Sequence, residues 1–233
     1  MSGEIQDHLD GPRREPDSGF ADQLVILLHG YGADGNDLIG LGDALAKPLP
    51  NTLFVAPNAP ERCANNPFGF QWFPIPWMDG SSEAEMARSF ARSVALLNDY
   101  LDEIAEASRI PPERTCLLGF SQGTMMSLHV GPRREEALGG IVGFSGRLLE
   151  PQGFAAAVKT RPPVLLVHGD QDPLVPFASM AEARKVLVSA EFDVATFRSV
   201  GTAHGIAPDG MKVATEFLNA NLKAPAESDE HKG

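Results

Sequence analysis

One short segment of this sequence, LLGFSQG at residues 117–123, restricts the possible folds more than any other. Its apolar first half is typical of a buried strand, and the Gly-x-Ser-x-Gly pattern that follows is typical of a sharp turn from a strand into a helix. Gly119 and Gly123 would let the backbone double back where larger side chains would collide. Ser121 would then stand at the tip of the turn, as a candidate nucleophile.

Five further apolar runs resemble the strand that leads into this turn. They are continuous rather than alternating, as expected for strands that have helices on both faces of their sheet. Strand followed by helix, repeated along the chain, predicts an α/β fold with a mostly parallel central sheet. The six predicted strands cover residues 24–28, 52–56, 115–120, 141–145, 164–168 and 194–199.

The clearest predicted helix covers residues 83–107. Its apolar side chains recur every three or four residues, and either Ser81 or Ser82 can cap its start. Further helices are expected after the turn at 34–36, after Ser121, near Pro176 and from Asp209.

Length and composition fit one catalytic domain. We place it at residues 22–222 of the 233, between a polar N-terminal segment at 1–21 and a charged tail at 223–233. The formal net charge of −12 would repel phosphate backbones, so nucleic acid is not an expected partner.

The sequence also predicts a cytoplasmic protein. The N-terminus lacks the pattern of a signal peptide, and no apolar run reaches the length of a membrane-spanning segment. The two cysteines, Cys63 and Cys116, are too few for a disulfide framework.

A serine hydroxyl needs a histidine to accept its proton and an acid to orient that histidine. After a turn of this type the acid comes first along the chain and the histidine second. Two candidate acids, Asp170 and Asp172, follow the strand at 164–168, and the residue pattern does not separate them. Among the six histidines, only His204 has both the required order and a place in a loop, between the last strand and the last helix.

Other residues compete less well for these roles. His129 lies eight residues beyond Ser121 on the same expected helix, which favours a packing or surface position, and His168 at a strand end favours a core position with a backbone partner. Ser145 follows another strand, but it lacks the second glycine and is interpreted as structural or as pocket lining.

An acyl-transfer site also needs backbone donors for the developing oxyanion. One is the amide of Gln122, after the serine, and the other is expected from Tyr31 in the glycine-rich loop after the first strand. The glycines of that loop, at 30, 32 and 35, also fit the spacing of a dinucleotide site. The second strand, however, ends at Asn58 without the acidic residue such a site needs, so a nucleotide site is a minor alternative.

Together, HGYG at 29–32, GFSQG at 119–123, HGDQDPLVP at 168–176 and the late His204 resemble the phospholipase/carboxylesterase family of α/β hydrolases, which includes the acyl-protein thioesterases. The resemblance implies an α/β-hydrolase fold and catalysis without a cofactor or metal. It implies that Ser121 is the nucleophile, Asp172 the acid and His204 the base, with the Tyr31 and Gln122 amides as the oxyanion hole.

An aromatic segment at 68–78 resembles the Trp-Phe loop of the family, and Trp72, Phe73 and Tyr31 are the predicted substrate-binding residues. Prolines in the segment argue against a regular helix. The segment could bind an acyl chain, cover the site or join a homodimer interface, and packing on the sheet edge is an equal alternative. Pro74 follows Trp72-Phe73, whereas the thioesterase branch has Asp there.

The sequence therefore predicts a serine hydrolase that cleaves small to medium acyl esters, or thioesters, through an acyl-enzyme on Ser121. Lysophospholipase or acyl-protein thioesterase activity is an alternative. A second class is a non-catalytic scaffold that binds an acyl ligand or a partner. A metal hydrolase that uses His168, Asp170 and Asp172 has too few ligands to be favoured.

Overall fold

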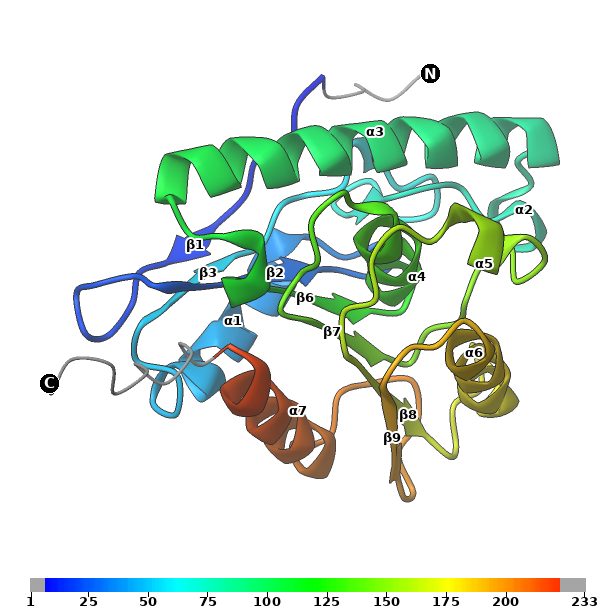
Figure 1. Cartoon of the computed structure of the whole chain (residues 1–233). Helices are drawn as coiled ribbons and strands as arrows, with labels where there is room; N and C mark the ends of the chain where they lie inside the picture. Colours follow the sequence, from blue (N-terminus) through cyan, green and yellow to red (C-terminus); the bar gives the residue numbers. More distant parts are fainter. Residues whose placement is uncertain (1–6, 223–233) are drawn as a thin grey trace, which may run out of the picture.

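A computed structural model describes residues 7–222 of the chain, and its core is a seven-stranded sheet (Figure 1). The strand order is β1-β3-β2-β6-β7-β8-β9, and every strand except the edge strand β1 is parallel to its neighbours. The predicted fold class is therefore confirmed. The strands are β1 (Arg13–Arg14), β2 (Gln23–Leu28), β3 (Thr52–Val55), β6 (Thr115–Phe120), β7 (Gly140–Phe144), β8 (Val164–Gly169) and β9 (Val194–Ser199), and β4 (Glu61–Arg62) with β5 (Phe70–Gln71) forms a separate antiparallel pair.

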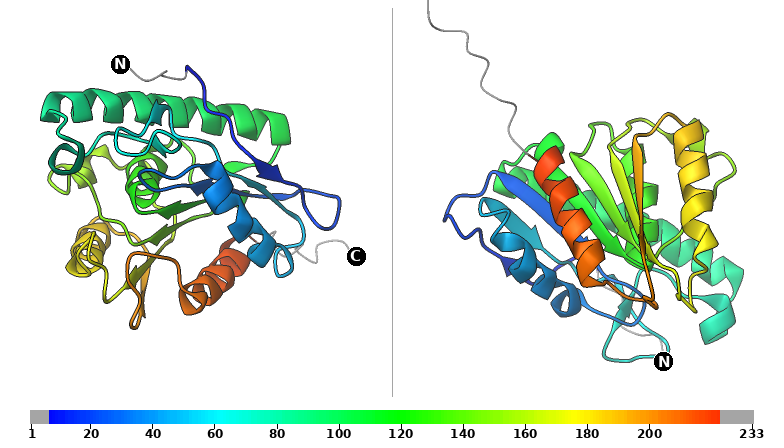
Figure 2. Two further views of the ribbon diagram at one scale, coloured as in Figure 1. Left: turned by 180° about the vertical axis from the view of Figure 1, so that it is seen from behind. Right: turned by 90° about the horizontal axis from the view of Figure 1, so that it is seen from below.

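Helices cover both faces of the sheet (Figure 2). The side chains of β2 show why its sequence is a continuous apolar run. Leu24, Ile26 and Leu28 pack in a cluster with side chains of α3 and α4, whereas Val25 and Leu27 pack on the other face with α1 and α7. The helices are α1 (Gly35–Ala46), α2 (Pro76–Asp79), α3 (Glu83–Ser108), α4 (Gln122–Val130), α5 (Phe154–Ala157), α6 (Ala178–Ser189) and α7 (Pro208–Asn221), with short 3-10 turns at Pro112–Arg114 and Gly131–Arg133.

Helix α3 begins where its capping residue lies. The Ser82 hydroxyl accepts a hydrogen bond from the Glu85 amide, and the Glu85 carboxylate accepts one from the Ser82 amide, so both orphan donors are satisfied. Of the two candidate caps, Ser82 is the one used. The apolar stripe of the helix buries Leu97 and Leu101 against the sheet, as predicted.

The N-terminal segment differs from expectation. The sequence places residues 1–21 outside the domain, but residues 7–21 pack on it. Leu9 is buried in the core, and β1 pairs with the edge of β3. Two consecutive arginines carry no apolar strand signal, so this pairing depends on the exposed edge that β3 offers. Residues 1–6 and the predicted tail at 223–233 lie outside the described part of the chain.

The aromatic segment also differs in part. Pro76 does not prevent helix formation but starts the single turn α2, because the first position of a helix needs no backbone N–H donor. This turn ends at Gly80, whose φ of 76° suits a residue without a Cβ.

Two absences concern residues 7–222. Within that range, no helix has the length and apolar character needed to cross a membrane. Among the same residues, Cys63 and Cys116 are buried as free thiols.

The order of the strands places a crevice at one point of the sheet. The chain runs from β2 to β3 on one side and then returns to β6 on the other side of β2. In open parallel sheets, ligands bind outside the carboxyl ends of the strands at such a switch point. Here those ends lead into the glycine-rich loop and into Ser121.

Candidate active site

Ser121 lies at a strained turn between β6 and α4, with φ 55° and ψ −113°. A Cβ on Gly119 would overlap the backbone of Gly123, and one on Gly123 would overlap the carbonyl of Leu28 on the neighbouring strand β2. Both glycines are therefore required by close backbone approach. A serine held in this unfavourable region is typical of a functional position.

His204 is bonded to the acid that the resemblance favoured. Its Nδ1 lies 2.7 Å from Oδ2 of Asp172, whose side chain is fully buried. The other carboxylate oxygen accepts hydrogen bonds from the amides of Leu174 and Val175, at 2.8 and 2.9 Å. Burial alone would raise the pKa of Asp172, but the hydrogen bonds from His204 and the two amides outweigh it, so the pKa lies below its ordinary value. Asp172 is thus an ionised acceptor that orients the imidazole.

Asp170 has a different contact. Its Oδ1 accepts a hydrogen bond from the Gly201 amide at 2.7 Å, and its Oδ2 lies 3.9 Å from Nε of Arg198. It therefore braces the β9–α7 loop that carries His204. The structure separates the two aspartates that the residue pattern left open.

The backbone amides of Gln122 and Tyr31 are the two predicted donors of the oxyanion hole. Gln122 is the first residue of α4, so its amide has no acceptor within the helix and adds to the positive end of the helix dipole. The Tyr31 amide has no hydrogen-bond acceptor within residues 7–222. Both residues line the same cavity as Ser121.

His29 fixes the peptide that carries the Tyr31 amide. Its Nε2 accepts a hydrogen bond from the Ala59 amide at 2.9 Å, so Nδ1 bears the proton and donates to the Gly30 carbonyl at 2.8 Å. Burial lowers the pKa of His29, which keeps the ring neutral. Because the C=O and N–H of a trans peptide point in opposite directions, holding the Gly30 carbonyl also sets the direction of the Tyr31 N–H. Sequence reasoning missed this role, whose signal is a polar residue at the buried end of an apolar strand.

The aromatic segment is held against the nucleophile by the side chain of Gln122. The Gln122 side chain accepts from the Trp72 amide at 3.1 Å and donates to the Phe73 carbonyl at 2.7 Å. Trp72 is fully buried, and its indole N–H donates to the His29 carbonyl at 2.9 Å. The prediction that Trp72 binds substrate is therefore wrong. Trp72 packs beneath the cavity, and only Phe73 of the pair lines it.

The cavity has a volume of about 510 Å³, and five of the predicted site residues line it: Tyr31, Phe73, Ser121, Gln122 and His204. Ser121 and His204 both line it, and the His204 ring packs beside Phe120, with the ring centroids 4.9 Å apart. Its wall is largely apolar. The apolar lining side chains come from the glycine-rich loop, the aromatic segment, α3, the end of β6, α4 and the loop after β8: Ala33, Phe73, Pro74, Ile75, Pro76, Trp77, Met78, Met86, Phe120, Met125, Leu174, Val175 and Pro176.

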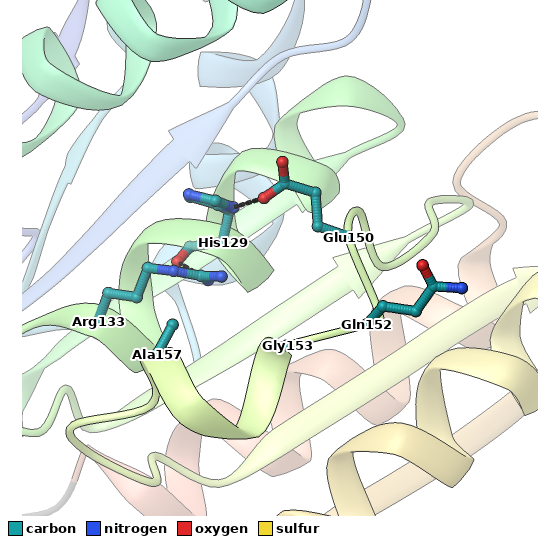
Figure 3. A pocket seen from close by; sticks show the side chains of 6 residues that line it. All are labelled: His129, Arg133, Glu150, Gln152, Gly153 and Ala157. Carbon is teal, nitrogen blue, oxygen red and sulfur yellow. Dashed lines mark hydrogen bonds and ion pairs between the residues drawn. The ribbon is translucent and has the colours of Figure 1, made fainter.

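A second cavity of about 500 Å³ lies at the other end of α4 (Figure 3). His129 in its wall lies 4.0 Å from a carboxylate oxygen of Glu150, and Arg133 lies beside them. Burial, together with the positive charge of Arg133, lowers the pKa of His129 to about 4. Its ring packs edge-on against Phe90, so the packing role predicted for His129 is confirmed.

Two remaining polar residues also have the predicted structural positions. Ser145 is buried at the end of β7, with φ 47°, and it is not part of the cavity wall that contains Ser121. His168 is buried, and its Nε2 donates to the Val175 carbonyl at 3.0 Å, which is the backbone partner expected for a core histidine.

The structure offers little support for the metal or nucleotide alternatives. Residues 7–222 contain no group of three or more His, Cys, Asp or Glu side chains placed to hold a metal ion. In the glycine-rich loop, a Cβ on Gly35 would overlap the Ala56 carbonyl, and one on Gly30 would press against the side chains of Phe120 and Ser121. Gly32 has a φ of 77°, which suits a residue without a Cβ. These glycines are explained by the fold itself.

Comparison with known proteins decides the family. The profile of the phospholipase/carboxylesterase family matches residues 14–222. The chain belongs to this family. The match begins within the N-terminal segment that packs on the sheet, and it ends with the last described residue of the domain.

Members of the family with related sequences include esterases and thioesterases. Acyl-protein thioesterase 1 of Gibberella zeae is 30% identical over 214 residues, which cover 85% of this chain and 90% of that protein. Esterase YpfH of Escherichia coli K12 is 28% identical over 205 residues, 87% and 84% of the two chains. The crystal structure of esterase PE8 is 40% identical, covers 92% of this chain and 100% of its own, and superposes with a TM-score of 0.87. As a member of this family, the chain is a carboxylic ester hydrolase with the α/β-hydrolase fold.

Proposed function

We propose that this family member hydrolyses small to medium acyl esters through a covalent acyl-enzyme on Ser121. The observation that carries the proposal is the shared cavity: Ser121 and His204 line one space, and His204 is bonded to the buried carboxylate of Asp172. A serine, a histidine and an acid are the three groups from which an activated nucleophile is built, and here one site brings them together.

In the proposed reaction, Oγ of Ser121 attacks the ester carbonyl while Nε2 of His204 accepts its proton, since Nδ1 is occupied by Asp172. The amides of Tyr31 and Gln122 stabilise the oxyanion. The tetrahedral intermediate expels the alcohol, which takes the proton from His204. Water, deprotonated by His204, then attacks the acyl-enzyme, and release of the acid restores the Ser121 hydroxyl.

The cavity supports a substrate of limited size. Its volume is in the range of ordinary small-molecule pockets, and its wall offers apolar contacts for an acyl chain. We assign Phe73 and Tyr31 to substrate contact. Trp72 is a positioning residue, because its hydrogen bond to the His29 carbonyl ties the aromatic segment to the oxyanion loop.

Thioesters are a second candidate substrate class, favoured by the thioesterase relatives. A thioester would pass through the same acyl-enzyme, with a thiol in place of the alcohol. Parallel assays of an oxygen ester and a thioester with the same acyl group measure the preference directly.

The test compares two buried serines with positive φ at the ends of neighbouring strands. Ser121→Ala should reduce hydrolysis of p-nitrophenyl butyrate by at least ~10³-fold, given the cost of removing a triad member. Ser145→Ala should keep the activity within about threefold, because the Ser145 hydroxyl has no hydrogen-bond partner to lose. Circular dichroism melting curves establish that both variants are folded.

If folded Ser121→Ala hydrolyses the ester like the wild type, the proposal is wrong. Failure of the wild type to hydrolyse any acyl ester or thioester would favour the non-catalytic scaffold instead.

A further inference from the structure

Arg147 occupies a distinctive place at the carboxyl edge of the sheet. It follows Gly146, and a Cβ on Gly146 would lie 3.0 Å from the carbonyl oxygen of Ser121. Arg147 lies in the loop after β7, and β7 lies between β6, which leads to Ser121, and β8, which leads to Asp172. The side chain of Arg147 lines the cavity together with Ser121 and His204.

No contact with another described residue accounts for the position of Arg147. Within residues 7–222 it makes no hydrogen bond, ion pair or cation–π contact. The acid three residues further on, Glu150, lies near His129 in the second cavity. Among the described residues lining the cavity, the only other permanently charged side chain is Glu83, which is exposed at the start of α3.

A guanidinium group in a largely apolar cavity has a specific chemical preference. Its planar fork of N–H donors matches the two oxygens of a carboxylate, and the pair is charge-assisted. The overall charge of −12 gives the protein no general attraction for anions, so any preference for one must come from a local cation.

We propose that Arg147 binds a carboxylate group of the substrate, so that the cavity favours esters bearing a carboxylate over neutral esters of the same length. This inference rests on the proposed function, because it assigns the substrate class of the same cavity. The carboxylate belongs either to the far end of the acyl chain or to the leaving group, and the probes below distinguish the two.

The experiment compares matched esters. Mono-p-nitrophenyl adipate and p-nitrophenyl hexanoate have acyl chains of equal length and differ in a terminal carboxylate. 4-Carboxyphenyl hexanoate and phenyl hexanoate differ by a carboxylate on the leaving group. The measured quantity is the ratio of kcat/KM for the anionic ester to that for its neutral partner.

Arg147→Gln should lower this ratio about fivefold for one of the two pairs, since an exposed ion pair contributes up to about 1 kcal/mol. Raising the salt concentration from about 0.01 M to about 1 M should lower the wild-type ratio in the same direction, because salt screens exposed charges. Arg184→Gln is the matched control: it removes the same charge from an exposed arginine on α6 outside the cavity wall, and it should leave the ratio unchanged.

The inference is wrong if Arg147→Gln leaves both ratios unchanged, or if Arg184→Gln lowers them equally. If the wild type hydrolyses the neutral esters and either of these results is found, only the assignment of Arg147 is wrong. A wild type inactive on all four esters contradicts the proposed function itself.

Discussion

Helix α4 contributes to two cavities of nearly equal volume, one beginning at Ser121 and the other around His129. Each contains a partly buried histidine near a carboxylate. In the first cavity, His204 and Asp172 are 2.7 Å apart, and in the second, His129 and Glu150 are 4.0 Å apart. The residue types are alike, but the geometry is not.

The difference lies in how the carboxylate is held. Asp172 is fully buried and accepts two backbone amides, so it stays ionised and fixed, whereas the Glu150 side chain is 67% exposed. An imidazole beside a fixed, ionised acid can accept a proton. The imidazole of His129, buried without such a partner, is held neutral by desolvation. The setting of the acid, more than the presence of a histidine, therefore distinguishes the proposed catalytic pair from a packed histidine.

The largest expected effect comes from the two histidines. His204→Gln should lower ester hydrolysis by about 10⁴-fold, because Ser121 then has no base. His129→Gln should keep it within about threefold, since an ordinary substitution away from the site costs little beyond stability. Steady-state rates with p-nitrophenyl butyrate measure both. Comparable losses of activity in the two variants would show that His204 and His129 do not differ in role.

The two aspartates give the next effect. Asp172→Asn should reduce turnover by about 10³-fold or more, because a neutral amide no longer holds and stabilises the His204 imidazolium. Asp170→Asn should reduce it by less than about fivefold, since its oxygen can still accept from the Gly201 amide. The greater loss in Asp170→Asn would show that the acid was assigned wrongly.

Replacing a glycine by alanine should cost more stability beside the first cavity than in the wall of the second. Gly123→Ala places a Cβ onto the Leu28 carbonyl. This overlap with the backbone of β2 should lower the free energy of unfolding by more than about 4 kcal/mol. Gly153, in the wall of the second cavity, has open space around it but a φ of 83°, so Gly153→Ala should cost only about 1–2 kcal/mol. Urea unfolding followed by circular dichroism measures both, and equal costs would argue against close packing at the elbow.

The smallest effect concerns pH. His129 takes up a proton near pH 6.5 in the unfolded chain but only near pH 4 in the fold, so the unfolded state binds more protons between these values. The free energy of unfolding should therefore fall as pH drops through this window. In His129→Gln, the fall between pH 7 and pH 4.5 should be smaller by about 1–2 kcal/mol, with solvent screening part of the charge. Urea titrations at the two pH values check this, and an unchanged fall would contradict burial of a neutral ring.

Much of the fold could be predicted because its signals are local. β6 and β8 are buried apolar runs that lie at the predicted positions, and the apolar stripe of α3 recurs every three or four residues from Met86 to Ile104. β9 also lies at the predicted residues, although it is a half-exposed edge strand. β1 and the β4–β5 pair could not be found in this way. Each of these strands has only two residues, too few to show a periodic pattern, so its strand geometry depends on its pairing partner.

The site was predictable where motif spacing sets backbone geometry, as at Ser121 with its two glycines. The site was less predictable where a side chain could bond to any of several partners. Asp172 is distinguished from Asp170 by its hydrogen bond to His204, which is 32 positions away. Trp72, predicted to bind substrate, is buried, and its indole N–H donates to the His29 carbonyl, 43 positions away. No local pattern contains contacts between residues so far apart.

Covalent labelling measures whether Ser121 is an activated nucleophile. The wild-type protein should be incubated with a fluorophosphonate probe and its peptides analysed by mass spectrometry. We expect a single adduct on the peptide containing Ser121, and its loss in both Ser121→Ala and His204→Gln. An unlabelled wild-type protein, or an adduct on Ser145 with Ser121 unmodified, would contradict this expectation.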